Sequence, residues 1–180
     1  MSIKSIEERI KDYPEIREAA LKLYSGFHKV HCPALGDKVH FTSEGFNHLV
    51  YEGAKKERDK RTQILRFDML RKAKFILETT TTYQEYEETI EYRKVNRNGK
   101  FVGMNMVVRC WGFVAIVKKF RVKVVVKQIG NGQIQFYSVI PAWFTKQYRD
   151  IKIIQTSTGA GLMSENDSEV LKNATRGGAL

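Results

Sequence analysis

The feature that most constrains the fold is a change in the spacing of apolar residues near Thr89. Before this point apolar residues recur every three or four positions, as on one face of a helix, and after it they alternate with polar residues, as in β-strands. The order indicates an α+β fold, with N-terminal helices packed on one face of a four- to five-stranded antiparallel sheet. The sheet is predicted over residues 89–143, with strands at 89–95, 100–104, 106–118, 121–129 and 133–140.

Two helical regions are predicted, at residues 5–27 and 55–77. Both carry an apolar face that is suited to packing on a sheet. In the first region, Ser5 and Glu8 have the spacing of a capping box. Pro14 is expected to begin a new helix, because proline breaks a helix interior but is tolerated in a first turn.

The remaining segments carry weaker patterns. Residues 28–39 are predicted to be a loop, and residues 79–88 a linker or an edge strand. Residues 1–150 are expected to form a single domain, because they have the length of one and contain no internal repeat. Residues 151–180 are rich in Gly, Ser, Thr and Asn, which predicts a flexible tail.

The last two strands are predicted to form a hairpin around Gly130-Asn131-Gly132, the strongest turn signal in the chain. A two-residue loop places lysines on the same face as Ile134 and Phe136, whereas a three-residue loop separates apolar from basic residues. Because a shift of one residue exchanges the faces, burial favours the three-residue loop. One face then carries Val122, Val124, Val126, Ile134, Phe136 and Ile140. The opposite face carries Arg121, Lys123, Lys127, Gln133, Gln135 and Tyr137.

The net charge of +11 is concentrated in one stretch of the chain. Residues 1–91 and 150–180 are close to neutral, whereas residues 92–149 contain no Asp or Glu. This stretch predicts a basic sheet surface for a polyanion such as nucleic acid. The alternative is an ordinary solvated face, on which lysines discourage edge-to-edge pairing. The basic residues of the stretch are Arg93, Lys94, Arg97, Lys100, Arg109, Lys118, Lys119, Arg121, Lys123, Lys127, Lys146 and Arg149.

Several classes of protein are disfavoured by the rest of the composition. Cys32 and Cys110 are too few for a disulfide framework, which favours a reducing compartment. Together with His28 and His31 they match no usual zinc-ligand spacing, and residues 92–149 have no carboxylate to hold magnesium, so no metal or cofactor is expected. The apolar runs are too short to span a membrane. We expect a cytoplasmic protein or one delivered into a target cell.

His48 is the first candidate catalytic residue. A metal-free ribonuclease needs a base that takes the proton of a 2′-hydroxyl, and cations that stabilise the phosphorane; the alternative is a structural histidine. Arg66 lies in the apolar arc of its predicted helix, where a guanidinium is costly unless it is paired, bound to an anion or extended to solvent. Arg61 lies on the neighbouring cationic flank, and Tyr137 is placed to stack on a base.

Two stretches resemble the phage-associated members of the barnase–EndoU–colicin–RelE-like (BECR) nucleases. The first is HFTSEGFNHLVYEG (residues 40–53) with the basic helix DKRTQILRFDMLRKAKFIL that follows it, similar to the region that precedes the sheet in those proteins. The second is RVKVVVKQIGNGQIQFYSVIPAW (residues 121–143), similar to their closing hairpin, in which a strand ends near a small hydroxyl residue, here Ser138. The resemblance spans residues 40–143.

The resemblance implies metal-independent cleavage of RNA, often transfer or messenger RNA, by toxins of phages, mobile elements or competing bacteria. His48 corresponds to a general base or acid, and Lys123 and Lys127 correspond to phosphate contacts. Tyr137 and Ser138 correspond to residues that line the site. Because the sheet has no second histidine, a Lys, Arg or Tyr must serve as the acid.

Three hypotheses follow, of which a toxin-like endoribonuclease is the first. Its catalytic residues are predicted to be His48, Arg66, Lys127, Tyr137 and Ser138. Its RNA contacts are predicted to be Arg61, Arg121, Lys123, Gln135, Lys118 and Lys119. The second hypothesis is a non-catalytic RNA- or DNA-binding module that uses the same sheet face. The third is a protein whose basic face docks an acidic immunity protein or antitoxin.

Overall fold

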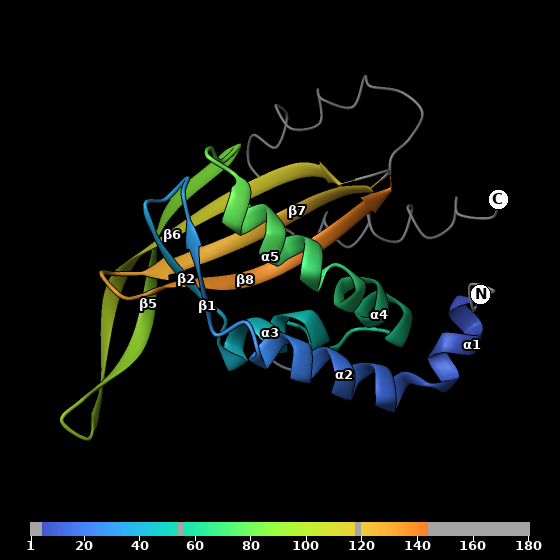
Figure 1. Ribbon diagram of the computed structural model, residues 1–180. Coiled ribbons are helices and arrows are strands. Elements are labelled where there is room, and N and C mark those ends of the chain that lie inside the picture. The colour runs from blue at the N-terminus through green and yellow to red at the C-terminus, as the bar shows by residue number, and fades with distance from the viewer. Residues whose placement is uncertain (1–4, 54–55, 118–119, 144–180) are drawn as a thin grey trace.

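The computed structural model describes residues 5–53, 56–117 and 120–143, and these form an α+β fold, which confirms the predicted class (Figure 1). In the described residues the main sheet has six strands in the order β1-β2-β8-β7-β6-β5. A small second sheet pairs β3 with β4. The strands are β1 (Lys29–Cys32), β2 (Asp37–His40), β3 (Tyr51–Glu52), β4 (Lys56–Glu57), β5 (Glu85–Arg97), β6 (Lys100–Val117), β7 (Phe120–Ile129) and β8 (Ile134–Trp143).

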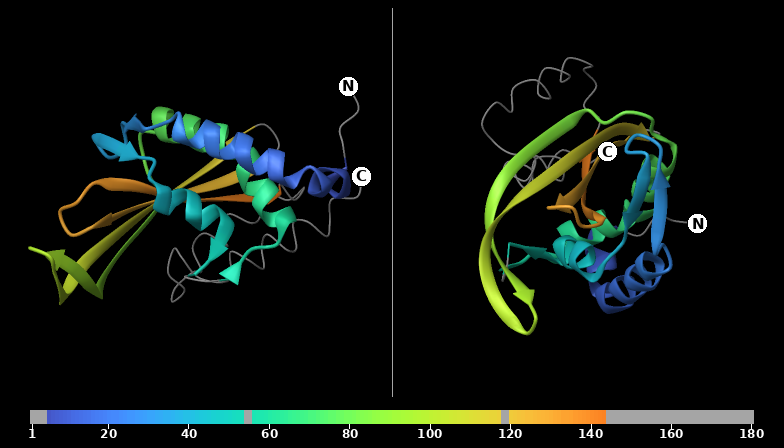
Figure 2. Two further views of the ribbon diagram at one scale, coloured as in Figure 1. Left: turned by 90° about the horizontal axis from the view of Figure 1, so that it is seen from below. Right: turned by 90° about the vertical axis from the view of Figure 1, so that its left-hand side faces the viewer.

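The helices all precede the long strands of the sheet. Helix α5 packs on β6 and β7, α4 packs on β8, and α2 packs on α4, so that the helices cover one face of the sheet (Figure 2). No helix in the described ranges is long and apolar enough to cross a bilayer. The helices are α1 (Ile6–Lys11), α2 (Tyr13–Ser25), α3 (Ser43–Val50), α4 (Lys60–Asp68) and α5 (Leu70–Thr79).

The sheet is mixed rather than wholly antiparallel. Strands β5 to β8 form the predicted antiparallel meander, and β5 is the outer strand, which places the second part of residues 79–88 in an edge strand. Strand β2, however, pairs in parallel with β8 through Val39 and Ile134. The prediction of four or five antiparallel strands therefore matches the sheet only roughly.

The additional strands come from residues 28–39, and the prediction of a loop there was wrong. Val30 and Cys32 of β1 and Val39 of β2 alternate with exposed residues and are buried in the core. Gly36 has a φ of 63°, a left-handed conformation that suits glycine in the tight turn between the two strands. The strands have four residues each, too few for the alternation to stand out from the turn-forming residues between them.

The first predicted helical region begins and breaks as expected. The Ser5 hydroxyl accepts a hydrogen bond from the Glu8 amide at 3.2 Å, and the Glu8 carboxylate accepts one from the Ser5 amide at 2.7 Å, which completes the capping box. The helix is interrupted at Asp12, and Pro14 occupies the first turn of α2.

The second predicted region was wrong at its start and in its continuity. Asp59 caps α4 by accepting a hydrogen bond from the Thr62 amide at 2.8 Å, so the helix begins at Lys60 and the preceding residues form the β3–β4 pair. At Met69 the chain ends α4 and starts α5, so one predicted helix is two.

The core between helices and sheet is centred on Tyr24, of which 2% is exposed. Its ring lies 5.3 Å from Phe41, 5.4 Å from Phe46 and 5.7 Å from Phe136, in edge-to-face arrangements that aromatic rings favour. These contacts join α2, α3 and β8. The N-terminal helices are thereby fixed to the strand that carries the candidate site.

The β7–β8 hairpin has the predicted three-residue register near its loop. Val126 pairs with Phe136, and Lys127 pairs with Gln135. The register then shifts between Val125 and Val126, so that Val139 rather than Ile140 faces the main core. The placement of Ile140 on the core face was therefore wrong, because it assumed an unbroken ladder.

Candidate active site

The register shift is a β-bulge that adds one residue, Tyr137, to β8. Phe136 pairs with Val126 and Ser138 pairs with Val125, so Tyr137 lies between two successive pairs. A bulge bends its strand and redirects side chains, which is why bulges recur beside active sites. The chain therefore presents Tyr137 and Ser138 in directions that a regular strand does not allow.

Helix α3 lies against β8 beside the bulge, and Gly45 permits the close approach. A Cβ at this position would lie 2.4 Å from the carbonyl oxygen of Phe136 and 2.3 Å from the Tyr24 hydroxyl, so any larger residue would push the helix outward. The Tyr24 hydroxyl donates to the Thr42 carbonyl at 2.9 Å, and the Thr42 hydroxyl donates to the Gln135 side chain at 3.2 Å. These contacts fix α3 relative to β8.

His48 projects from α3 onto the bulge. Its ring centroid lies 3.8 Å from that of Tyr137, with 41° between the planes. The Lys127 ammonium lies 5.1 Å from the centroid of the same ring, within cation–π range. Tyr137 therefore contacts both the imidazole and a cation.

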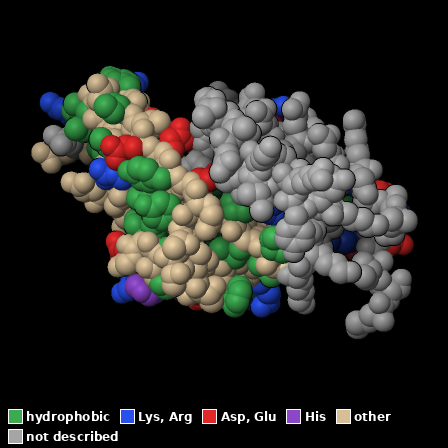
Figure 3. Space-filling view, turned by 90° about the horizontal axis from the view of Figure 1, so that it is seen from above, with side chains coloured by type: hydrophobic (Ala, Val, Ile, Leu, Met, Phe, Trp, Pro, Cys, Tyr) green, Lys and Arg blue, Asp and Glu red, His purple; other side chains and the backbone are tan. Residues whose placement is uncertain are grey.

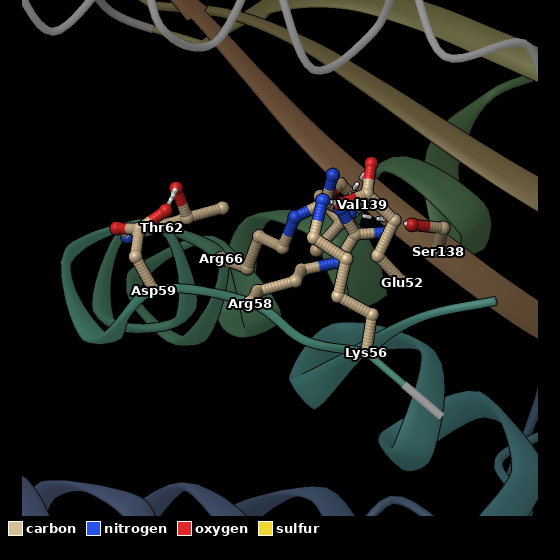
Figure 4. A network of polar contacts seen from close by, with 8 residues as sticks. All are labelled: Glu52, Lys56, Arg58, Asp59, Thr62, Arg66, Ser138 and Val139. Carbon is tan, nitrogen blue, oxygen red and sulfur yellow. Dashed lines mark hydrogen bonds and ion pairs between the residues drawn. The ribbon is translucent and has the colours of Figure 1, made fainter. Parts of the chain in front are cut away.

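Arg66 reaches the bulge from α4. Its Nη1 donates to the Ser138 hydroxyl at 2.8 Å and to the Val139 carbonyl at 3.1 Å (Figure 4). Only 2% of Arg66 is exposed, and both of these acceptors are neutral oxygens. Of the alternatives for an arginine in an apolar arc, the structure supports a buried and hydrogen-bonded guanidinium over one that extends to solvent.

We call His48, Arg66, Lys127, Tyr137 and Ser138 the bulge cluster. They lie on α3, α4, β7 and β8, and the sequence analysis had selected all of them as the catalytic residues. The structure brings them together at a single bulge. This juxtaposition makes a common site geometrically feasible.

The environment keeps the His48 imidazole neutral at physiological pH. The pKa of His48 is lowered to about 4, mainly by burial, with Glu44 opposing the shift and the cations Lys127, Arg58 and Arg66 adding to it. Burial also raises the pKa of Tyr137 above its ordinary value, so its phenol keeps its proton. The cluster thus combines a neutral proton acceptor with a protonated hydroxyl.

The predicted wholly basic sheet face was wrong. The Lys123 ammonium lies 2.9 Å from a Glu85 carboxylate oxygen, and the Lys127 ammonium lies 3.8 Å from Glu91. Lys127 is also buried rather than open to solvent. Both acids lie on β5 before residue 92, outside the stretch of residues 92–149 that contains no Asp or Glu. The count of charges along the sequence therefore did not show that they pair with Lys123 and Lys127. On the face seen in Figure 3, acidic and basic side chains of the described residues lie interspersed.

The predicted RNA contacts are spread more widely than the bulge cluster. Gln135 pairs with Lys127 and lies at the site. Lys123 is four residues from Lys127 along β7 and Arg121 is six, about 13 and 20 Å at the usual rise of a strand. Arg61 lies in the first turn of α4. Lys118 and Lys119 fall outside the described residues, as do residues 144–180 with the predicted tail.

A pocket of about 280 Å³ next to His48 was not predicted from the sequence. It is lined by the exposed side of α3 and the segment that follows, through Glu44, Asn47, His48, Tyr51 and Gly53. The first four follow the i, i+3, i+4, i+7 spacing of one helix face, a signal that could have found them. The pocket offers an aromatic ring and several hydrogen-bonding groups beside the imidazole.

A group of charges around Glu52 adjoins Arg66 and was also missed. Glu52 lies 3.6 Å from the Lys56 ammonium and 3.9 Å from the Arg58 guanidinium (Figure 4). Lys56 and Arg58 belong to β4 and the chain that follows it, which were predicted as the start of the helix at residues 55–77. Both cations lie beside Arg66 in Figure 4.

The described ranges contain no group of three or more His, Cys, Asp and Glu side chains placed to hold a metal ion. No protein-family model matches the chain, and neither curated proteins nor solved structures provide a match.

Proposed function

We propose that the chain is a metal-independent endoribonuclease of the BECR type, with the bulge cluster as its active site. The observation that carries the proposal is the convergence of His48, Arg66, Lys127, Tyr137 and Ser138 from separate elements onto one bulge. Attack by a 2′-hydroxyl requires a base, an acid and groups that stabilise the charge of the phosphorane, and the cluster offers an imidazole, two cations and two hydroxyls for these roles. The run of α3 to α5 into the antiparallel β5–β8 meander is the order that the BECR resemblance implies.

In this mechanism His48 accepts the proton of the 2′-hydroxyl. The 2′-oxygen forms a bond to the adjacent phosphorus while the bond from phosphorus to the 5′-oxygen breaks, which leaves a 2′,3′-cyclic phosphate and a 5′-hydroxyl end. Lys127 and Arg66 stabilise the charge of the phosphorane, and Ser138 holds the Arg66 guanidinium in place. Tyr137, against the His48 ring, donates the proton that the 5′-oxygen takes up.

The lowered pKa of His48 fits a base whose proton affinity rises when the substrate binds. Burial favours the neutral imidazole, which is the form that accepts a proton. A phosphate beside the ring adds negative charge and so raises the pKa of His48 towards neutrality, where a general base is most effective. The substrate would be RNA, such as transfer or messenger RNA, in the cytoplasm of the producing cell or of a target cell.

One observation favours a second candidate, a non-catalytic RNA- or DNA-binding module that uses the same surface. A pKa of about 4 for His48 lies well below the near-neutral values of efficient bases. In such a module Lys127, Lys123 and Arg121 contact the phosphate backbone and Tyr137 stacks on a base. An acidic immunity protein or antitoxin is a proposed partner of either form.

The test is cleavage of total RNA by the purified full chain in EDTA. We expect activity without added metal, and a loss of about 10²-fold or more in His48→Ala. His31→Ala is the matched control, because His31 is exposed on β1 and should leave the rate unchanged. A requirement for Mg²⁺, or equal rates for the two variants, would contradict the mechanism. Salt-dependent binding without cleavage would favour the module.

A further inference from the structure

Strands β5 and β6 form a two-stranded ribbon that projects beyond the rest of the sheet. Strand β6 pairs with β5 down to Lys100 but with β7 only from Val108 onward. Residues 90–97 together with 100–107, which pair with each other beyond the reach of β7, are called the arm, which extends past the β7–β8 loop in Figures 1 and 2. An isolated two-stranded ribbon is marginally stable in water, so a projecting one calls for an explanation.

One face of the arm carries large apolar side chains that are open to solvent. Ile90 is 72% exposed, Tyr92 71% and Phe101 74%. Ile90 pairs with Val107 and Tyr92 with Asn105, so these side chains continue the face on which Trp111 enters the core. Helices cover that face near Trp111 but leave it open along the arm, which makes it an unpartnered extension of the core surface. Figure 3 shows hydrophobic side chains among charged ones on the projecting part of the molecule.

The outer edge of the arm is a regular strand. The ladder between β5 and β6 runs without a register shift from Glu85 to Arg97, and β5 contains no proline. Bulges, prolines and charged side chains are the usual devices that keep an edge strand from pairing with another chain. Strand β5 lacks bulges and prolines, and its charges are of both signs.

The charges of β5 are divided between its two halves. The acidic residues Glu85, Glu87, Glu88 and Glu91 precede Tyr92, and the basic residues Arg93 and Lys94 follow it. A parallel partner with this sequence would align acid with acid. An antiparallel copy would align acid with base, which is the self-complementarity that a two-fold interface requires.

We propose that the arm is a homodimer interface, in which β5 pairs antiparallel with β5 of a second copy about a two-fold axis at Tyr92. In this register each Tyr92 lies opposite its own copy, and each Glu91 lies opposite the second copy's Arg93. Each Ile90 lies opposite the second copy's Lys94, whose stem covers apolar surface. The two sheets join into one, and the exposed apolar residues of both arms lie side by side. This proposal does not depend on the ribonuclease activity proposed for the bulge cluster.

The first test is sedimentation equilibrium of the full chain across a range of concentrations. We expect reversible association to twice the monomer mass of 20.8 kDa. Ile90→Lys places two lysines opposite each other and should weaken the dimer at least tenfold, whereas Ile90→Glu faces Lys94 and should retain it. The two substitutions remove the same apolar side chain from an exposed position. A difference between their dissociation constants therefore reports the charge that residue 90 faces in the proposed register. A monomer at all concentrations, or equal dissociation constants for the two variants, would overturn the proposal.

The second test is cross-linking at the proposed axis. Residues opposite each other in an antiparallel pair have Cα atoms about 4.5 to 5.5 Å apart, which a disulfide can span. Tyr92→Cys should therefore form a disulfide-linked dimer under mild oxidation, and Ile90→Cys should not, although it lies two residues away on the same face. Wild-type protein controls for Cys32 and Cys110, both of which are buried. Equal cross-linking of both variants would contradict the register.

Discussion

The two outer strands of the β5–β8 meander have opposite surroundings. Beside β8, strand β2 and helices α3 and α4 cover the edge, and polar side chains such as Arg66 and Ser138 are buried there. Beside β5 no strand of the described residues pairs with the edge, and apolar side chains such as Ile90 and Tyr92 are exposed.

The difference separates two roles within one sheet. Polar groups buried at β8 must be hydrogen-bonded and held in fixed positions, and fixed polar groups are what catalysis needs. Apolar groups exposed at β5 gain free energy only when another surface covers them. We therefore assign chemistry to the covered edge and association to the open one.

The largest expected effect comes from a charge buried at the covered edge. Arg66→Met removes the donor to the Ser138 hydroxyl and the Val139 carbonyl, so both oxygens are left in the interior without it. We expect the free energy of unfolding to fall by about 3 kcal/mol, measured by urea denaturation. Lys94→Met, at the exposed edge, should change it by less than about 0.5 kcal/mol when both variants are measured as monomers at low concentration. Equal losses of unfolding free energy in the two variants would contradict the distinction between the covered edge at β8 and the open edge at β5.

A smaller loss of stability is expected at Gly45, which permits the contact of α3 with β8. The Cβ of Gly45→Ala would meet the Phe136 carbonyl at 2.4 Å, so we expect a loss of about 2 kcal/mol in thermal or urea unfolding. Gly26→Ala is the matched control, because its Cβ would lie 3.4 Å from its nearest neighbour at an ordinary φ of −70°. A stable Gly45→Ala would show that α3 moves freely against the strand.

The effect that is smallest near neutral pH concerns the pH dependence of stability. Because the pKa of His48 is about 4 in the folded protein and near 6.5 when unfolded, the unfolded chain takes up a proton first as the pH falls. Stability should therefore decline from about pH 6.5 towards pH 4, measured by urea unfolding at several pH values. His48→Gln should reduce this decline, and His31→Gln should leave it unchanged. An unaltered decline in His48→Gln would contradict the burial of the imidazole.

Local signals predicted a large part of the fold. The glycines around Asn131 specified the loop register, and Ser5 with Glu8 specified the first helix start, because the chemistry of a cap or a turn lies within a few residues. The strands β1 and β2 were missed because four residues on each side of the turn at residues 33–36 give too little alternation to be recognised.

The site required information that the sequence does not carry locally. Residue type alone singled out His48 and Arg66, but the bulge that redirects Tyr137 depends on how β8 meets β7, α3 and α4 together. The ion pairs of Lys123 and Lys127 with β5 were missed for the same reason, since strand pairing places Glu85 and Glu91 across the sheet from them.

The central claim is that the bulge cluster cleaves RNA by attack of the 2′-hydroxyl. Analysis of the ends of the RNA fragments tests it most directly, with the full chain in EDTA and a defined oligoribonucleotide. The account predicts 2′,3′-cyclic phosphate and 5′-hydroxyl ends that are abolished when the 2′-hydroxyl at the cleaved position is replaced by hydrogen. Fragments with 5′-phosphate ends, or cleavage of the deoxy-substituted strand, would contradict it.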